Sequence, residues 1–344
     1  MAGYTSSSIP VSCEQSCTAP YIDCRQCPRK CTINRAEKKH GFCGETDEVR
    51  AALACLHFGE EPPIAVTGGS GTIFLTGCTL RCAFCQNYQI SQGGYGKSLS
   101  SDDFSHICLK LQDAGAENIN LVTGSHCIPH LAEYIFNAQQ NGCEIPFCWN
   151  SSAYESVEML NLLKPLVKIW LPDLKTTNSA LSKKLFGAED YPDVAKSAIL
   201  WMIQNFPPKI EKKQDDMEKP TEKMLEGVVV RHLFLPGHFA ETVEVLSWLK
   251  ENADGRAYIS LMNQYTPVDF KEGKKVHEKR MSSLSVIENR LVSEEEDADL
   301  RDLIDIYDFE NLFYQELSDD TSWLPDFTKP QVFPNALSKT IWHC

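Results

Sequence analysis

Three cysteines, Cys78, Cys82 and Cys85, follow a short strand-like run over residues 72–76. Thiolates are the usual ligands of iron–sulfur clusters, and a four-iron cluster commonly takes four of them. Because this loop offers only three and continues as Gln86, one iron of a [4Fe-4S] cube would lack a protein ligand and could bind a substrate or cofactor. The alternatives are a zinc loop or a chance grouping, but zinc loops are typically built from C-x2-C pairs.

A second cysteine group precedes this loop. Its four thiols lie within 20 residues of sequence, at Cys24, Cys27, Cys31 and Cys43. Four thiolates so close together favour a closed metal site, which is either zinc or a second iron–sulfur cluster. Buried thiols without a metal are a third interpretation. The spacing favours neither zinc nor iron–sulfur over the other.

Composition restricts the class of protein. The chain has 344 residues, a formal net charge of −14 and a hydrophobic share of 42%. The acidic balance argues against nonspecific binding to nucleic acid or to anionic membranes. No apolar run is long enough for a transmembrane helix, and residues 1–10 lack the apolar core of a signal peptide. The sequence contains 15 cysteines without an export signal, so we expect a reducing, cytoplasmic location with metal ligation.

Strand-like and helical segments alternate after residue 71. Strands are predicted over 72–76, 118–123, 146–150, 167–171, 228–235 and 257–262. Helices are predicted over 101–114, 129–141, 155–164, 189–205 and 240–251. Strands separated by helices pair in parallel with right-handed crossovers. Six such units predict an α/β fold, an open (β/α)6 partial TIM-like barrel, with its site at the C-terminal ends of the strands. The three-cysteine loop follows the first strand, at that end.

The remaining segments suggest how the chain is divided. We expect a flexible tail over 1–21, a Cys-rich module over 22–66, a barrel over 67–270 with a surface insertion at 207–226, and a charged linker with a C-terminal helix and tail over 271–344. Residues 51–71 are interpreted as loop. Within that loop His57, Glu60 and Glu61 form either a proton or metal site or, the favoured interpretation, a segment that packs over the cluster.

Motifs along most of the chain point to one family. They comprise HFGEEPP at 57–63, GSGTIF at 69–74, CAFCQNYQIS at 82–91, NINLVT at 118–123, LPDLK at 171–175, RHLFLPG at 231–237 and LMNQYTP at 261–267. Together with the C-x3-C-x2-C loop, they resemble the radical S-adenosylmethionine (SAM) superfamily, and within it the iron–sulfur proteins described as homologues of pyruvate formate-lyase activating enzyme. The resemblance runs from about Cys24 to Phe327.

The resemblance implies a cofactor set and a site. The cofactors are a [4Fe-4S] cluster on the three cysteines and SAM, which chelates the open iron and is cleaved reductively to a 5′-deoxyadenosyl radical. It implies SAM or substrate contacts at the cysteine loop and at the strand ends, from Phe84, Asn87, Thr123, Gly124, Asn150, Ser152, Asp173, Lys175 and Arg231. Related activating enzymes often carry an acid in the glycine-rich motif after the second strand. Here Ser125 and His126 stand in its place.

The predicted function is hydrogen abstraction from a substrate that the sequence does not identify. A glycyl-radical enzyme, activated at a glycine Cα, is the leading substrate class. Radical modification of another peptide, a lipid or a small metabolite is the alternative. A non-catalytic iron–sulfur or zinc protein is a third class, and cluster-dependent SAM cleavage distinguishes it from the enzymes. An electron donor such as flavodoxin or ferredoxin is the expected partner, and no nucleic acid or membrane is expected.

Overall fold

A curved, mostly parallel sheet organises the chain. The computed structural model describes residues 19–213, 221–321, 323–334 and 336–344, so most of the predicted tail over 1–21 lies outside the described residues. Six parallel strands are neighbours in chain order: β2 (Ser70–Leu75), β4 (Ile119–Val122), β5 (Phe147–Ser151), β6 (Val167–Pro172), β8 (Thr221–Leu233) and β9 (Tyr258–Met262). The predicted open (β/α)6 partial barrel, with a Cys-rich segment before it, is confirmed.

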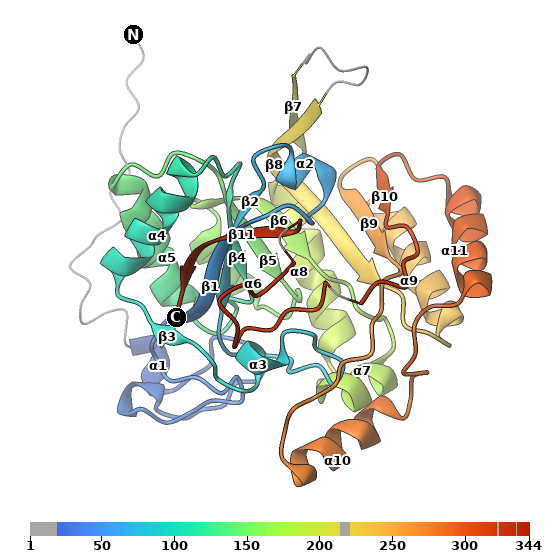
Figure 1. Ribbon diagram of the computed structural model, residues 1–344, viewed down its shortest axis with the longest axis horizontal. Coiled ribbons are helices and arrows are strands. Elements are labelled where there is room, and N and C mark those ends of the chain that lie inside the picture. The colour runs from blue at the N-terminus through green and yellow to red at the C-terminus, as the bar shows by residue number, and fades with distance from the viewer. Residues whose placement is uncertain (1–18, 214–220, 322, 335) are drawn as a thin grey trace.

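Helices connect the strands and cover the outside of the sheet (Figure 1). They are α4 (Ser101–Asp113), α5 (Ile128–Gln140), α6 (Val157–Leu163), α7 (Ser179–Phe186), α8 (Tyr191–Asn205) and α9 (Phe239–Asn252). Helix α4, predicted over 101–114, begins with a capping box between Ser100 and Asp103. Helix α7 was not predicted, although Asn178 caps its first turn and Gly187 ends it in the left-handed conformation.

Burial on both faces explains the long apolar runs of the strands. Every residue of β2 and β5 is buried. Trp149 of β5 pairs in register with Trp170 of β6, and both indoles are fully buried. Parallel strands sandwiched between other elements show continuous apolar character instead of alternation. The same property hid one strand from sequence analysis.

Residues 51–71 are not the loop that the sequence suggested. They contain most of β1 (Arg50–His57), which pairs antiparallel with β2, then α2 (Pro62–Ala65) and the start of β2. The interior of β1 is buried throughout, so its side chains show none of the polar–apolar alternation that indicates a strand.

The C-terminal segment extends the sheet at both edges. β11 (Ser338–His343) pairs antiparallel with β1, and β10 (Leu312–Tyr314) pairs parallel with β9. A short strand β3 (Lys97–Ser98) also pairs with β1. The sheet thus joins segments from both ends of the described chain.

The two ends of the barrel carry different segments (Figure 1). At the C-terminal end of the parallel strands lie α1 (Ala19–Ile22), η1 (Arg35–Glu37), α3 (Tyr88–Ser91) and α7. At the opposite end lie α2 and the outer part of the β7 (Lys209–Lys213)–β8 hairpin. The predicted insertion over 207–226 therefore includes an extension of the fifth barrel strand.

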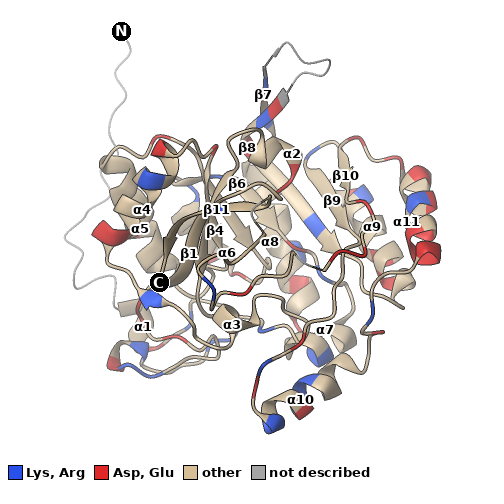
Figure 2. Ribbon diagram, viewed as in Figure 1, with Lys and Arg blue, Asp and Glu red and all other residues tan. Residues whose placement is uncertain are grey.

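The charged segment after residue 270 holds two helices, α10 (Lys274–Leu284) and α11 (Glu294–Tyr307). Sequence analysis predicted a helix in this segment, and α11 begins with a capping box between Ser293 and Glu296. Figure 2 shows the acidic character of α11. Among the helices described, none is both long and apolar enough to cross a membrane.

The capping box of α11 gives a pH-dependent contribution to stability. Glu296 accepts hydrogen bonds from the amides of Ser293 and Gly237 and forms an ion pair with Arg290. Burial raises the pKa of Glu296, but these partners outweigh it and hold the pKa at about 2, below the ordinary value of 4.5. The stabilisation is therefore complete above about pH 4.5 and is lost as the pH falls toward 2.

We expect Glu296→Gln to lower the free energy of unfolding by about 1 kcal/mol at pH 7 and by much less near pH 2. Urea denaturation of the cluster-free protein at several pH values measures this difference. Glu295→Gln, an exposed acid of the same helical turn, is the matched control. An equal loss for Glu296→Gln at both pH values would contradict the assignment.

Candidate active site

The three-cysteine loop leaves the C-terminal end of β2. Cys78 and Cys82 are buried, and Cys85 is partly buried. The amides of Leu80 and Arg81 each donate to Cys78 Sγ over 3.4 Å, and Ser91 Oγ lies 3.3 Å from Cys85 Sγ. Because N–H and O–H donors stabilise a thiolate, the local backbone suits cysteines that act as ligands.

The kind and number of thiols on this loop suit a cluster. Among the described residues, no three Cys, His, Asp or Glu side chains stand close enough together to hold a single metal ion. A cube distributes its protein ligands over separate irons, so thiols around it stand farther apart than the ligands of one ion. Cys78, Cys82 and Cys85 offer three thiol ligands on one loop, and hydrogen-bond donors face two of their sulfurs. This arrangement fits a [4Fe-4S] cluster with one open iron.

Charged and polar side chains from three neighbouring strands meet beside this loop. Lys175 Nζ lies 2.7 Å from Asp173 Oδ2, and Arg231 Nε donates to Asp173 Oδ1 over 2.9 Å. Arg231 Nη2 also donates to Asn150 Oδ1 over 2.5 Å. These residues follow or end β5, β6 and β8, so the structure brings together four of the predicted site residues.

A second carboxylate, that of Glu60, approaches the same guanidinium. Glu60 Oε2 lies 3.5 Å from Arg231 Nη1, and its other oxygen accepts from Asn120 of β4. The side chains of Arg231 and Glu60 are 13% and 10% exposed. Arg231 therefore spans the inside of the barrel between the strand ends and the loop before α2.

Burial and neighbouring charges set the ionisation of this network. Burial raises the pKa of Asp173, but Arg231 and Lys175 outweigh it, so the pKa lies below its ordinary value. Burial also raises the pKa of Glu60 and Glu61, and attraction to Arg231 opposes this only in part. Burial lowers the pKa of Lys175, yet attraction to Asp173 and to the Cys82 thiolate raises it overall. Lys175 thus places a stable positive charge within electrostatic range of the cysteine loop.

The segment with His57, Glu60 and Glu61 does not pack over the cysteine loop, so the favoured interpretation was wrong. His57 ends β1 and pairs with Ser70, the first residue of β2, whereas the cysteines follow the last. The segment lies at the N-terminal end of the barrel strands (Figure 1). The reason is the antiparallel pairing of β1, which sequence analysis had treated as loop.

The loops after β4 and β5 meet at a carboxylate that sequence analysis missed. Ser125 Oγ and Trp149 Nε1 both donate to Glu155 Oε1, over 2.5 and 3.4 Å. Burial raises the pKa of Glu155, and these donors oppose it. The loop after β5 therefore places a carboxylate, thirty residues along the chain from Ser125, beside the turn after β4.

Other predicted site residues surround this point. Thr123 has a φ of +65°, and a side chain at Gly124 would collide with the Trp149 indole, so the turn after β4 packs directly on β5. Ser152 is partly exposed just after β5. His126, 2% exposed, has no hydrogen-bond partner in the structure on either ring nitrogen. Burial lowers its pKa to about 3, so the ring is neutral.

Phe84 and Asn87 have different surroundings. The Phe84 ring packs edge-on against Phe186 and Tyr265, which places it in the apolar contact between the loop and the barrel. Asn87 precedes α3, and its Oδ1 is buried without a hydrogen-bond partner in the structure. A buried acceptor without a donor is costly, so Asn87 is suited to a hydrogen-bonding ligand and Phe84 to packing.

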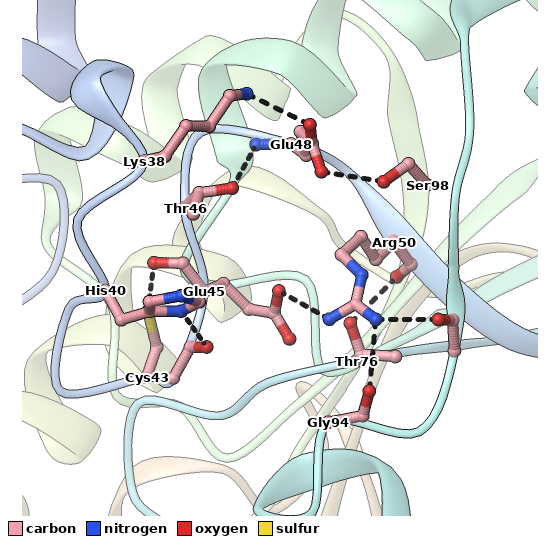
Figure 3. A network of polar contacts seen from close by, with 12 residues as sticks. Lys38, His40, Cys43, Glu45, Thr46, Glu48, Arg50, Thr76, Gly94 and Ser98 are labelled. Atoms are coloured by element: carbon pink, nitrogen blue, oxygen red, sulfur yellow. Dashed lines mark hydrogen bonds and ion pairs between the residues drawn. The ribbon is translucent and has the colours of Figure 1, made fainter.

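The N-terminal cysteine segment is docked on the three-cysteine loop. Cys78 N donates to Cys43 O over 3.1 Å, and Arg81 Nη1 donates to Phe42 O over 3.2 Å. Figure 3 shows the next contact, an ion pair between Glu45 and Arg50 with a distance of 3.3 Å. Arg50 also donates to the carbonyls of Gly94 and Gly96. The two cysteine groups therefore form one structural unit.

Gly77 makes this docking possible. Its φ is +77°, and a Cβ there would collide with Cγ of Glu45 and press on Cys43 O. We expect Gly77→Ala to lower the free energy of unfolding by at least about 2 kcal/mol, since backbone strain and overpacking act together. Gly94→Ala is the matched control, because its φ is +70° but the space around it is open. Urea denaturation measures both; equal losses would show that the contact with Glu45 does not matter.

Comparison with known proteins identifies the superfamily. Residues 72–214, which include the cysteine loop and four of the barrel strands, match the family model of the radical SAM superfamily. Over 255 residues the chain is 30% identical to the uncharacterised protein MJ0674 of Methanocaldococcus jannaschii, covering 72% of this chain and 67% of that protein. The chain belongs to the radical SAM superfamily. The resemblance stated from the motifs is thereby confirmed at the level of the superfamily.

Solved radical SAM structures are more distant. Methylornithine synthase (PylB) is 13% identical with a TM-score of 0.46, over 71% of this chain and 70% of that one. Streptococcus suis SuiB bound to its precursor peptide SuiA is 13% identical with a TM-score of 0.45, over 70% of this chain and 46% of that one. The chain thus spans less than half of SuiB.

Proposed function

We propose that this radical SAM protein binds a [4Fe-4S] cluster through Cys78, Cys82 and Cys85, cleaves SAM reductively and abstracts hydrogen from a substrate. The observation that carries the proposal is the meeting of the three-thiol loop with the Asp173–Lys175 pair at the C-terminal ends of the strands. When bound, the cluster and SAM together supply a 5′-deoxyadenosyl radical at the expense of one electron from an external donor.

In this proposal the residues of the chain bind and orient SAM and shield the radical from water. Asp173 and Lys175 present opposite charges for the carboxylate and ammonium groups of the SAM methionine. Asn150, Ser152, Thr123 and Gly124 form the polar rim for the nucleoside, and Asn87 offers its unpartnered acceptor. Phe84 and its aromatic neighbours keep water from the loop, which protects a reactive primary radical from side reactions.

The polar interior of the barrel favours a polar substrate. Arg231, Glu60 and Asn120 carry charge and amide groups in the interior of the barrel. Buried charges and amides of this kind suit a polar substrate better than an acyl chain, so this interior disfavours a lipid. A glycine-containing peptide loop of a glycyl-radical enzyme is the leading candidate on sequence resemblance, followed by another peptide or a small polar metabolite. Hydrogen moves from the substrate C–H bond to the 5′ carbon, leaving a substrate radical and 5′-deoxyadenosine.

The proposed site implies a reducing environment and an external electron donor. The protein would take electrons from a flavodoxin or ferredoxin, and a cytoplasmic location goes with thiolates and clusters that oxidation destroys. The net charge of −14 disfavours nucleic acid as a partner.

The test is anaerobic reconstitution followed by dithionite and SAM. We expect at least about four irons per chain and formation of 5′-deoxyadenosine, which candidate polar substrates should accelerate. Deuterium transfer from a labelled substrate into 5′-deoxyadenosine identifies the abstracted position. Iron binding without 5′-deoxyadenosine, across polar candidates and a glycyl-radical peptide, would favour the non-catalytic class. Absence of iron would overturn the proposal.

A further inference from the structure

The N-terminal cysteines are tied together by hydrogen bonds. The amide of Thr32 donates to Cys24 O over 3.0 Å, which brings the segment after Cys31 back against Cys24. The amide of Phe42, next to Cys43, donates to Cys31 Sγ over 3.4 Å. The amide of Lys30 closes a turn on Cys27 O. The four thiols are free of disulfides, and only Cys31 is more than slightly exposed.

A buried arginine faces these thiols. Arg35 is 1% exposed. Within the part of the chain that the structure describes, its hydrogen bonds go to the carbonyls of Glu45, His126 and Thr46 and to Cys24 Sγ, the last over 3.6 Å. The nearby Glu45 carboxylate pairs with Arg50 instead.

A buried guanidinium without a carboxylate is costly unless another anion balances it. Arg35 donates to Cys24 Sγ, and a Cβ added at Gly41 would touch both Cys43 Sγ and Arg35 Cδ, so two of the four thiols lie beside this arginine. Metal ligation is the ordinary way to keep a buried thiol ionised. The arginine is therefore placed to balance the negative charge of a metal–thiolate group.

The position of the group favours iron–sulfur over zinc. Cys43 O accepts directly from the amide of Cys78, so the two thiol sets are neighbours. Arg29 donates to Thr79 O, in the three-cysteine loop, and to the carbonyls of Phe186 and Gly187 at the end of α7. A redox centre here would lie next to the main cluster and could exchange electrons with it, whereas zinc has no redox chemistry.

We propose that Cys24, Cys27, Cys31 and Cys43 hold a second [4Fe-4S] cluster, fully ligated by protein, that relays electrons to the cluster on the three-cysteine loop. Four protein ligands leave no open iron, so this cluster transfers electrons and does not bind substrate. One electron enters from an external low-potential donor of the flavodoxin or ferredoxin class, or from dithionite in vitro, and one electron leaves to the main cluster. The relay rests on the proposed function; the metal site does not.

The metal site is tested in the full chain after removal of the main loop's thiols. The triple variant Cys78→Ala/Cys82→Ala/Cys85→Ala is reconstituted anaerobically. We expect it to keep about four irons and four sulfides per chain and to give an EPR signal after reduction with dithionite. We expect the wild type to hold about eight irons, and Cys344→Ala, which removes an exposed thiol, to match it. Stoichiometric zinc or no metal in the triple variant would overturn the proposal.

The reciprocal variant separates this inference from the proposed function. We expect about four irons to remain on the main loop when all four N-terminal cysteines are replaced, in the quadruple variant Cys24→Ala/Cys27→Ala/Cys31→Ala/Cys43→Ala. If this variant binds iron and the triple variant binds none, the second cluster is refuted and the proposed function stands. The single variant Cys31→Ala, at the most exposed of the four thiols, serves if the quadruple variant fails to fold, and its iron content should fall below that of the wild type.

The relay is tested by EPR of the reduced wild type. Two neighbouring paramagnetic clusters broaden each other's signals, so the wild-type spectrum should differ from the sum of the spectra of the two variants. A spectrum equal to that sum would overturn the relay.

Discussion

Cys82→Ala is expected to abolish SAM cleavage while the barrel stays folded. The residue lies in the middle of the three-cysteine loop, and the charge of Lys175 acts on its thiolate. Because the loop supplies only three thiols, loss of one leaves two ligands, too few for a stable cube with an open iron. We expect 5′-deoxyadenosine to fall to background in the anaerobic assay with dithionite and SAM.

The control for this variant is another buried cysteine of the barrel. Cys148→Ala removes a thiol from β5 that belongs to neither cysteine group, so it should keep iron and SAM cleavage. Circular dichroism of both variants checks that the fold survives. Persistent SAM cleavage by Cys82→Ala would refute the ligand assignment.

Arg231→Met is expected to have the largest effect on stability. The guanidinium bonds to Asp173 and Asn150 and pairs with Glu60 inside the barrel. Its removal leaves buried carboxylates short of a positive charge, and breaking such a pair from one side typically costs about 3–5 kcal/mol. Methionine fills a similar volume, so little of the loss comes from a cavity. Urea denaturation of the cluster-free protein measures the change in the free energy of unfolding.

Two further arginine variants calibrate this loss. Arg231→Lys keeps the charge but cannot reach all three partners at once, so it should lie between Arg231→Met and the wild type. Arg256→Met removes an exposed arginine and should change stability by less than about 0.5 kcal/mol. A loss below about 1 kcal/mol for Arg231→Met would show that another group balances the carboxylates.

Local sequence signals located the cysteine loop and most barrel elements correctly. The C-x3-C-x2-C spacing follows a buried strand, and six strand-like runs appear in the order in which the strands pair. The helix predicted over 101–114 and the predicted C-terminal helix correspond to α4 and α11, each of which begins with a capping box. These signals succeed because hydrogen bonding, chain spacing and burial periodicity act over a few residues.

Local signals failed where partners are distant in the chain. β1 was taken for loop because burial on both faces removes its alternation, and this error put the Glu60 segment at the wrong end of the barrel. Glu155 lies outside every motif, and only the pairing of β4 with β5 brings it to Ser125. Arg35 shows no sign in the sequence that it is buried against thiols.

The sequence by itself therefore determined which groups can do chemistry here: seven cysteines at metal-binding spacings and a set of polar residues at strand ends. Only the tertiary structure decided which of them meet. Parallel strand order places Asn150, Asp173 and Arg231 in contact, and hydrogen bonds from Cys78, Arg81 and Arg29 join the two cysteine groups. The physical reason is that side-chain type is a local property, whereas distance and burial depend on which strands become neighbours.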